Sequence, residues 1–445
     1  MHHWNQVAVD STGLDHTPSN QGDPHVFGEQ LGPGRSARAM ALVHIAIFDA
    51  VNSITHRYRS FTGIPDVHES ASIDAAIAQS AHDTLVELFP SQHIHCDQLL
   101  EAELNAIPNT AEKSHGINAG RRAARTVLTL AAQDGSNRPE PRVGVEYIPG
   151  TQPGEWRPDP ISNLPLALGA YWGEVRPMVI QSAAAVRVPP PPALNSAAYA
   201  QAYNEAKQLG GDGVTTPTLR TDDQTLTGIY WAYDGTPSLC APPRLYNQLV
   251  MHLADKAGVT DPTELARIMA LVNVAMSDSG VAAWESKYYW KFWRPITGIR
   301  ESDPGTGPSG LGDGNPLTVG DPTFTPLGAP ASNLAGPDFT PPFPSYPSGH
   351  ATFGGAVFQM LRNLAGTDNY PFTFVSDELN GETVDSHGVV RPLLPRSFTS
   401  FSQAEEENGQ SRIYLGIHWS FDKTAGIEQG RKIANEIYSK VALPR

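Results

Sequence analysis

Apolar residues recur at three- and four-residue spacing through most of the first 134 residues, which is the period of an amphipathic helix. Short connections separate these stretches, so neighbouring helices are expected to pack against one another. The pattern predicts helices over residues 37–53, 73–89, 93–106 and 111–134.

The periodic pattern stops at Gly135 and gives way to Pro-rich sequence that ends in four consecutive prolines at 189–192. We predict an irregular crossing segment over residues 135–193. Helical periodicity then returns, and Pro295 is expected to end the last helix of this group. The predicted helices cover residues 196–209, 222–233, 245–257 and 263–293.

Gly and Pro are dense between Asp303 and Tyr346, which predicts a long loop without regular structure. Two more helices are expected to begin near Ala351 and Thr424, and no strand alternation is evident between them. The predicted class is therefore mainly α, with two antiparallel four-helix bundles and long Pro/Gly-rich loops. Residues 1–195 would form the first bundle with the crossing segment, and residues 196–445 the second bundle with the site.

The chain is acidic, with 31 Lys and Arg against 46 Asp and Glu and a formal net charge of −15. This balance argues against nucleic acid and against an anionic membrane surface as partners. The most apolar stretch, residues 37–51, is shorter than the roughly 20 residues that cross a bilayer, which predicts a soluble protein without membrane contact. An anion site must therefore be a local cationic pocket.

Cysteine usage and the N-terminus leave the compartment open. Cys96 and Cys240 allow at most one disulfide and exclude a cysteine-rich metal site. The sequence MHHWNQVAVDSTG has no basic region followed by an apolar core, so no signal peptide is predicted in this chain. Secreted and periplasmic locations both stay open, as does association into a homo-oligomer.

The first motif with chemical content is KYYWKFWRP at 287–295. Lys287 and Arg294 are seven residues apart, which is two helical turns, so both are predicted to project from one helix face. There they could grip opposite sides of an oxyanion. A solvated basic stripe is the alternative for charges at this spacing.

The second motif is PSGH at 347–350, directly before a helical run. At a helix start Ser348 can cap the first turn, while the amide of Gly349 can donate to an anion. His350 would then lie at the rim of the anion site. A capping box beside an incidental histidine is the alternative.

The third motif is SRIYLGIHWSFD at 411–422. Six residues of helix rotate by about 240°, so Arg412 and His418 can share a site only if the helix breaks, and Gly416 is the candidate break. Asp422 follows His418 by four residues. This spacing suits a carboxylate that accepts from one imidazole nitrogen while the other binds a metal or phosphorus centre. An ordinary ion pair at a helix end is the alternative.

The three motifs occur together in one order, K-x6-RP, PSGH and SR-x5-H-x3-D, which makes chance occurrence improbable. This signature resembles that of vanadium haloperoxidases and the related acid phosphatases. The stretches GIYWAYDG, PPRLYNQ, PPFPSYPSGHATFGGAVFQM and SRIYLGIHWSFD resemble fungal chloroperoxidases in particular. The resemblance covers roughly residues 221–422, and the N-terminal third matches only in general helical character.

The resemblance implies a vanadate cofactor, with phosphate able to occupy the same site, and implies that His418 is the nitrogen ligand of vanadium. Hydrogen bonds to the vanadate oxygens are expected from Lys287, Arg294, Ser348, Gly349 and Arg412. His350 is expected to act in catalysis with Lys287 and His418, by exchanging protons with hydrogen peroxide. Supporting carboxylates are expected at Asp234, which would orient Arg412, and at Asp422.

The same resemblance places Trp284 and Phe343 on the halide side of the pocket. Phe343 has no polar edge and cannot hydrogen-bond to His350, which favours the harder oxidation of chloride. Trp284 would add an apolar wall with one N–H donor that could face a halide.

These features predict an enzyme that oxidises chloride or bromide with hydrogen peroxide to hypohalous acid, which then halogenates small organic acceptors. A soluble acid phosphatase working through a phosphohistidine at His418 is the alternative that the signature leaves open. The large N-terminal helical section, Trp284 and Phe343 favour the peroxidase. A non-catalytic oxyanion-binding protein is disfavoured, because His350 and His418 would be unnecessary for binding alone.

Overall fold

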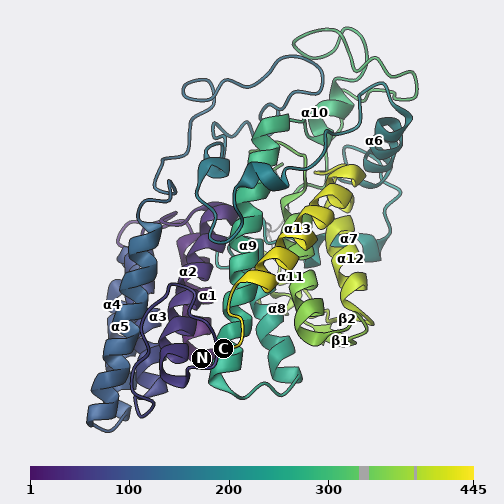
Figure 1. Cartoon of the computed structure of the whole chain (residues 1–445). Helices are drawn as coiled ribbons and strands as arrows, with labels where there is room; N and C mark the ends of the chain where they lie inside the picture. Colours follow the sequence, from purple (N-terminus) through teal and green to yellow (C-terminus); the bar gives the residue numbers. More distant parts are fainter. Residues whose placement is uncertain (330–339, 385–387) are drawn as a thin grey trace.

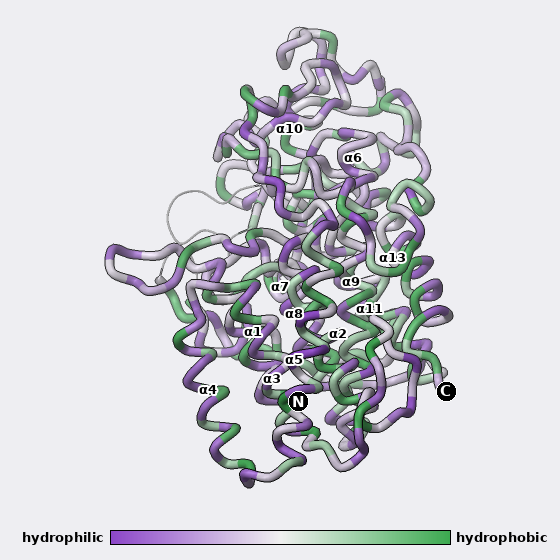
Figure 2. Tube along the Cα trace, turned by 60° about the vertical axis from the view of Figure 1, so that its left-hand side comes forward, coloured by the Kyte–Doolittle hydropathy of each residue, from purple (hydrophilic) through white to green (hydrophobic). Residues whose placement is uncertain are grey.

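Long helices packed side by side make up most of the computed structural model, which describes residues 1–329, 340–384 and 388–445 (Figure 1). Long loops and the short helices α6 (Ala197–Leu209) and α10 (Pro295–Arg300) gather at one end of the molecule in both views (Figures 1 and 2). The mainly helical class predicted from the hydrophobic pattern is confirmed.

The first third of the chain forms α1 (His2–Asp15), α2 (Gly32–Thr55), α3 (Ile73–Leu88), α4 (His93–Ala106) and α5 (Ala111–Ala131). α3 packs against α2 and α5, while α4 buries only Cys96 and lies on the outside. The four helices predicted here are present. α1 was not predicted, although its buried positions Trp4, Val7, Ala8 and Ser11 follow helical spacing.

The rest of the chain adds further helices and one small sheet. The helices are α7 (Asp222–Tyr230), α8 (Pro242–Lys256), α9 (Pro262–Trp290), α11 (Gly349–Ala365), α12 (Phe401–Tyr414) and α13 (Ser420–Lys440). β1 (Phe372–Phe374) pairs antiparallel with β2 (Arg396–Phe398), with Phe372 opposite Phe398. The sequence pattern did not predict α10, α12 or the two strands, and α13 starts four residues earlier than expected.

α9 is the central helix of the molecule. It packs along α2 on one side and against α11 and α13 on the other, and one hydrophobic cluster runs through all four helices (Figure 1). α2 and α9 are long and apolar enough to cross a membrane, but their apolar windows are 100% and 89% buried inside the protein, as in core helices. The division of the chain at residue 195 stays a prediction, and α9 of the second unit packs along α2 of the first.

The prediction that Lys287 and Arg294 share one helix face is wrong. α9 ends at Trp290, three residues before the predicted end, and Lys291 closes it in the left-handed conformation with φ +50°. Arg294 is instead the residue that caps the start of α10, in the extended conformation that a residue before proline prefers. The helix therefore stops between the two cations.

The break predicted between Arg412 and His418 is present. α12 ends at Tyr414, Gly416 takes φ +71°, and α13 begins at Ser420. A Cβ atom at residue 416 would lie 2.4 Å from the carbonyl oxygen of Gly210, so the turn also requires a close backbone approach.

The segments predicted to be irregular lack long elements where they are described. Residues 135–193 hold the short 3₁₀ turns η2 (Trp172–Glu174) and η3 (Ala183–Val186), and two others, η1 (Pro90–Gln92) and η5 (Asp377–Leu379), lie elsewhere. Residues 303–329 and 340–346 contain no helix or strand, while residues 330–339 of the same predicted loop lie outside the described residues. Cys96 and Cys240 are buried and unpaired.

Candidate active site

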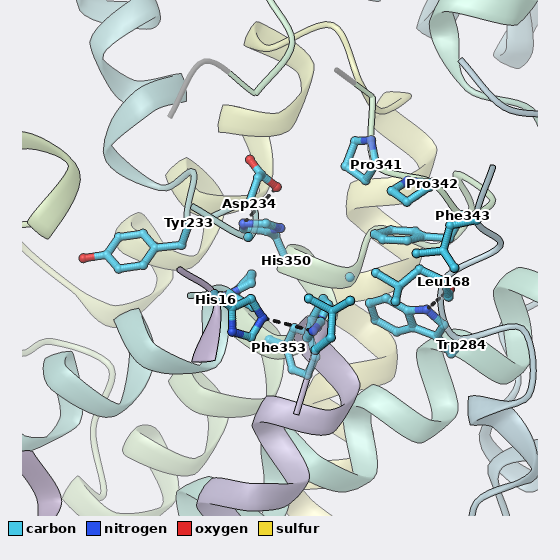
Figure 3. Close-up of a pocket in the computed structure, with 18 of the residues that line it drawn as sticks. His16, Leu168, Tyr233, Asp234, Trp284, Pro341, Pro342, Phe343, His350 and Phe353 are labelled. Carbon is cyan, nitrogen blue, oxygen red and sulfur yellow. Dashed lines mark hydrogen bonds and ion pairs between the residues drawn. The ribbon is translucent and has the colours of Figure 1, made fainter. Parts of the chain in front are cut away.

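Residues of the second and third motifs line one cavity of about 240 Å³ (Figure 3), and Lys287 and Arg294 of the first motif are buried beside it. Its wall includes seven of the residues singled out from the sequence, namely Asp234, Trp284, Phe343, Gly349, His350, Arg412 and His418. Four others, Lys287, Arg294, Ser348 and Asp422, are buried behind this wall and contact residues that form it. The structure thus brings together side chains from α9, α11, α12 and the turn before α13.

His418 lies in the turn between α12 and α13, and Asp422 in the first turn of α13 holds its ring. Nδ1 of His418 donates to Oδ2 of Asp422 at 2.7 Å, and the hydroxyl of Ser345 donates to the same oxygen. Nε2 is therefore the nitrogen that carries the electron pair. Burial and the charges of Arg294, Lys287 and Arg412 hold the pKa of His418 well below its ordinary value, so the ring is neutral.

Two arginines present unused donors at the site. Nη1 of Arg294 donates to the carbonyl of Ile417 at 2.8 Å and to Nε2 of His418 at 2.9 Å, and Nη2 of Arg412 donates to Oδ1 of Asp234 at 2.6 Å. Among the described residues, Nη2 of Arg294 and both Nε and Nη1 of Arg412 are buried without an acceptor. Unsatisfied buried donors are costly, so this arrangement suits an oxyanion that accepts from them.

Lys287 is fully buried, and its ammonium group donates to the carbonyls of Pro344, Ser345 and Pro347 at 2.9, 2.8 and 2.5 Å. These bonds use all three of its N–H groups. Lys287 thereby holds the loop that leads into α11. A direct hydrogen bond from Lys287 to an oxyanion would require one of the three to open.

The start of α11 borders the cavity. Ser348 caps the helix by accepting from the amide of Ala351, and its own amide donates to the carbonyl of Asp422 at 3.0 Å. A Cβ atom at Gly349 would lie 3.2 Å from the Trp284 ring, which explains the small residue at this position. The first amides of a helix lack intrahelical acceptors and favour negative charge, so this end of α11 adds to the anion-binding character of the wall.

His350 follows on the same helix. Its Nε2 donates to the carbonyl of Ala232 at 2.5 Å, so Nδ1 is the basic nitrogen of the neutral ring. Burial and the charges of Arg412 and Lys287 hold the pKa of His350 well below its ordinary value. The carboxylate of Asp234 lies 4.0 Å from the ring (Figure 3). His350 is thus a neutral base with a counter-charge beside it.

Trp284 and Phe343 pack together with ring centroids 4.9 Å apart, and the side chains of Lys287 and Arg294 lie over the Phe343 ring at 5.1 and 4.9 Å. The prediction that the indole N–H of Trp284 could face a halide is wrong. This N–H donates to the carbonyl of Leu168 at 3.1 Å, so Trp284 presents only carbon atoms to the cavity (Figure 3).

Glu378 is a supporting residue that the sequence did not reveal, because no motif surrounds it. Its fully buried carboxylate accepts from the backbone N–H of Tyr233 at 2.8 Å, and Tyr233 has the uncommon φ of +45°. Asp234, the partner of Arg412, is the next residue. Burial raises the pKa of Glu378 to about 7, although Arg391 lies 3.5 Å away. The carboxylate therefore holds the backbone that positions Asp234.

The sequence also failed to reveal a second part of the cavity wall, because it belongs mostly to loops without a motif. This wall is apolar, and we call it the apolar wall: Phe27, Leu31, Pro33, Leu164, Leu166, Leu168, Pro341 and Pro342. Most of these residues precede residue 196, in the part of the chain to which no site residue had been assigned. The cavity is therefore built from both halves of the chain.

Known proteins are similar to this chain in both sequence and fold. Residues 267–444 match a family model described as the VCPO second helical-bundle domain. The chain is 32% identical to the vanadium chloroperoxidase of Curvularia inaequalis over 95% of its own length and 78% of that protein.

Two bacterial structures show that the likeness of fold extends over nearly the whole chain. The first bacterial vanadium-dependent iodoperoxidase matches with a TM-score of 0.76 and 22% identity, over 99% of this chain and 96% of that one. A holo-type bacterial vanadium-dependent chloroperoxidase matches with a TM-score of 0.67 and 17% identity, over 95% of each chain.

Proposed function

The chain belongs to the vanadium haloperoxidase family, and we propose that it oxidises chloride and bromide with hydrogen peroxide at the cavity beside His418. The product would be hypohalous acid, which halogenates small organic acceptors. One observation carries this proposal: three buried guanidinium nitrogens of Arg294 and Arg412 lack an acceptor among the described residues and lie beside a neutral histidine. A tetrahedral oxyanion with an open coordination position satisfies both features.

The residues present fit vanadate. Nε2 of His418 would bind vanadium in place of its hydrogen bond from Nη1 of Arg294, while Arg294, Arg412 and the amide of Gly349 would donate to the oxygens. Ser348 would add its hydroxyl, and Lys287 would add charge from behind the wall. Bound vanadate would supply a Lewis acid that activates hydrogen peroxide toward halide. Three fixed cations offset the cost of burying its negative charge.

His350 would move the proton. Because its ring is neutral, Nδ1 can take a proton from incoming hydrogen peroxide, and Asp234 at 4.0 Å stabilises the imidazolium that forms. The hydrogen bond from Nε2 to Ala232 keeps the ring in this orientation throughout. Asp234 would in turn be held in place by Glu378 through the Tyr233 backbone.

The halide side would be formed by the ring faces of Phe343 and Trp284. Neither offers a hydrogen bond there, since Phe343 has none and the indole N–H of Trp284 is bound to Leu168. A dry, apolar surface leaves a small anion poorly solvated and therefore reactive. This supports oxidation of chloride as well as bromide.

Vanadate reconstitution tests the proposal. Purified protein would be stripped of oxyanions and titrated with vanadate, while bromination and chlorination of a phenolic dye are recorded with hydrogen peroxide present. We expect halogenation that saturates with vanadate, and competition by phosphate because the same donors hold either anion. Halogenation that is indifferent to vanadate, or rapid phosphate-ester hydrolysis with phosphate trapped on His418, would favour the acid phosphatase instead.

A further inference from the structure

The cavity is larger and more apolar than an oxyanion, peroxide and a halide require. His350, Arg412 and His418 line one part of the cavity and the apolar wall lines another. In Figure 3, His350 and Asp234 lie apart from Leu168, Pro341 and Pro342. A cavity lined mainly by hydrocarbon with a few polar groups at one side is the usual form of a small-molecule site. The position of the polar groups fixes which end of a ligand would face the oxidant.

The apolar wall reaches the protein surface. Phe27 is 45% exposed and Leu164 is 37% exposed, although both line the cavity, and the neighbouring Val26 is 55% exposed. Exposed apolar side chains that continue into a cavity are typical of a binding site. An apolar molecule can therefore contact this wall from solvent and pass inward along it.

The charges at the cavity select a neutral ligand. Among the described residues that line it, the only carboxylate is Asp234, and Arg412 already binds it. The Oδ2 atom of Asp234 has no partner among the described residues, but Arg412 already balances the charge of this carboxylate and would repel an ammonium group. A carboxylate on the ligand would compete with the oxyanion for the same donors.

His16, the one other histidine on the wall, does not change this selection. Its Nδ1 bonds to the carbonyl of Thr12 and its Nε2 accepts from the amide of Gly32, both at 3.0 Å. Neither nitrogen is free to bind a charged group of the ligand.

We propose that the apolar wall binds the organic acceptor, and that this acceptor is a neutral, electron-rich aromatic molecule such as an alkylphenol. The inference rests on the proposed haloperoxidase activity, and it places halogen transfer inside the cavity. In the transfer, ring electrons form the carbon–halogen bond and the oxygen–halogen bond of hypohalous acid breaks. The ring proton leaves with the hydroxide as water.

An acceptor bound in the cavity should give a different ratio of halogenated products from an acceptor that reacts with free hypohalous acid in solution. Holding two reactants together raises their effective concentration and fixes which ring carbon faces the halogen. For 2-propylphenol, which offers ring positions 4 and 6, the ratio of the two bromophenols should differ from that produced by free hypobromous acid. The rate should also saturate with the concentration of the phenol.

Binding can be measured apart from activity. We would titrate 2-propylphenol into phosphate-loaded protein and follow it by saturation-transfer NMR and calorimetry, with tyramine as the cationic comparison. Leu164→Arg and Leu166→Arg should weaken binding by about tenfold or more, because each places a charge in the apolar wall. Val214→Arg, at a 92% exposed position outside the cavity, is the matched control and should bind normally.

Measuring peroxide consumption and phenol halogenation separately distinguishes failure of this inference from failure of the proposed function. Bromide-dependent consumption of hydrogen peroxide needs no organic acceptor, so in the native protein it reports the proposed function alone. Leu164→Arg should lose both saturation by the phenol and the altered bromophenol ratio, whereas Val214→Arg should keep both. Absence of peroxide consumption with vanadate present would overturn the proposed function. Normal consumption with no binding of 2-propylphenol, no saturation and the ratio of free hypobromous acid would overturn the acceptor site alone.

Discussion

Oδ2 of Asp422 accepts the hydrogen bond from Nδ1 of His418 at 2.7 Å, which leaves the electron pair of the imidazole on Nε2. The second oxygen of Asp422 is buried without a partner among the described residues, and the hydroxyl of Ser345 binds the first. The carboxylate thus decides which ring nitrogen can act as a ligand, and its replacement makes a sharp test.

Asp422→Asn should weaken vanadate binding by about 10- to 100-fold, because an amide can donate to Nδ1 and move the ring proton to Nε2. Equilibrium dialysis followed by vanadium analysis measures this affinity. Glu436→Gln, which removes a carboxylate from the Lys440 pair on the same helix, is the control. Equal affinity in Asp422→Asn and the control would remove Asp422 from this role.

His418→Ala and His350→Ala should separate binding from turnover. The first should abolish tight retention of vanadate, since hydrogen bonds do not replace a coordinate bond. His350→Ala should retain vanadate, but its halogenation rate should fall by about 100-fold or more, because the proposed role of His350 is proton transfer. Vanadium content and halogenation rate would be measured on the same samples. Loss of vanadate from His350→Ala with an unchanged rate per bound ion would contradict the assignment.

Phe343→His should reduce chlorination more than bromination. The imidazole adds a polar edge beside His350 and the halide side of the cavity, where the native ring offers only carbon. This change disfavours the oxidation of chloride, which is harder than that of bromide. Chloride and bromide turnover would be compared at mildly acid pH in the native protein and the variant, with Phe343→Leu as an apolar control. A native enzyme that brominates but does not chlorinate would show that these aromatics do not set halide preference.

Glu378→Gln should change how stability depends on pH. Burial raises the pKa of Glu378 from 4.5 to about 7, so the folded protein binds more protons than the unfolded chain between those values. The free energy of unfolding therefore falls as pH rises through this window, by on the order of 3 kcal/mol for a fully buried group. Glutamine cannot ionise and should remove this slope.

Urea unfolding of both proteins at pH 5 and pH 8 measures the effect of Glu378. The difference between the native protein and Glu378→Gln should shift in favour of the variant at pH 8. Glu428→Gln, at an exposed position in α13, provides the control and should keep the native slope. Parallel pH profiles for all three proteins would show that Glu378 does not titrate in this range.

The sequence predicted which residues lie together at the cavity better than it predicted the helix ends. Spacing alone required a break between Arg412 and His418, and Gly416 supplies it at φ +71°. The same kind of reasoning failed for Lys287 and Arg294, because a seven-residue separation is compatible with one helix face but does not require an unbroken helix. What ends α9 is the left-handed Lys291, and no propensity of lysine predicts that conformation.

Contacts between distant segments could not be predicted from the sequence. Glu378 supports Asp234 across more than 140 residues, and the carbonyl of Leu168 captures the indole N–H of Trp284. Each contact depends on how separate helices pack, which local periodicity does not encode. α12 was missed for a related reason: its buried face includes the polar residues Glu405, Asn408, Ser411 and Arg412, so the apolar stripe is interrupted.

Most of the apolar wall comes from a different stretch of the chain than the residues proposed to hold the anion, and this has an evolutionary consequence. The residues proposed to hold the anion lie after residue 286, whereas Phe27, Leu31, Leu164 and Leu166 lie in loops before residue 170. Mutation can therefore remodel the apolar wall without changing the residues proposed to hold the anion. A lineage can diversify its products by drift in these loops, and directed evolution confined to them would explore substrate scope with little risk to the cofactor.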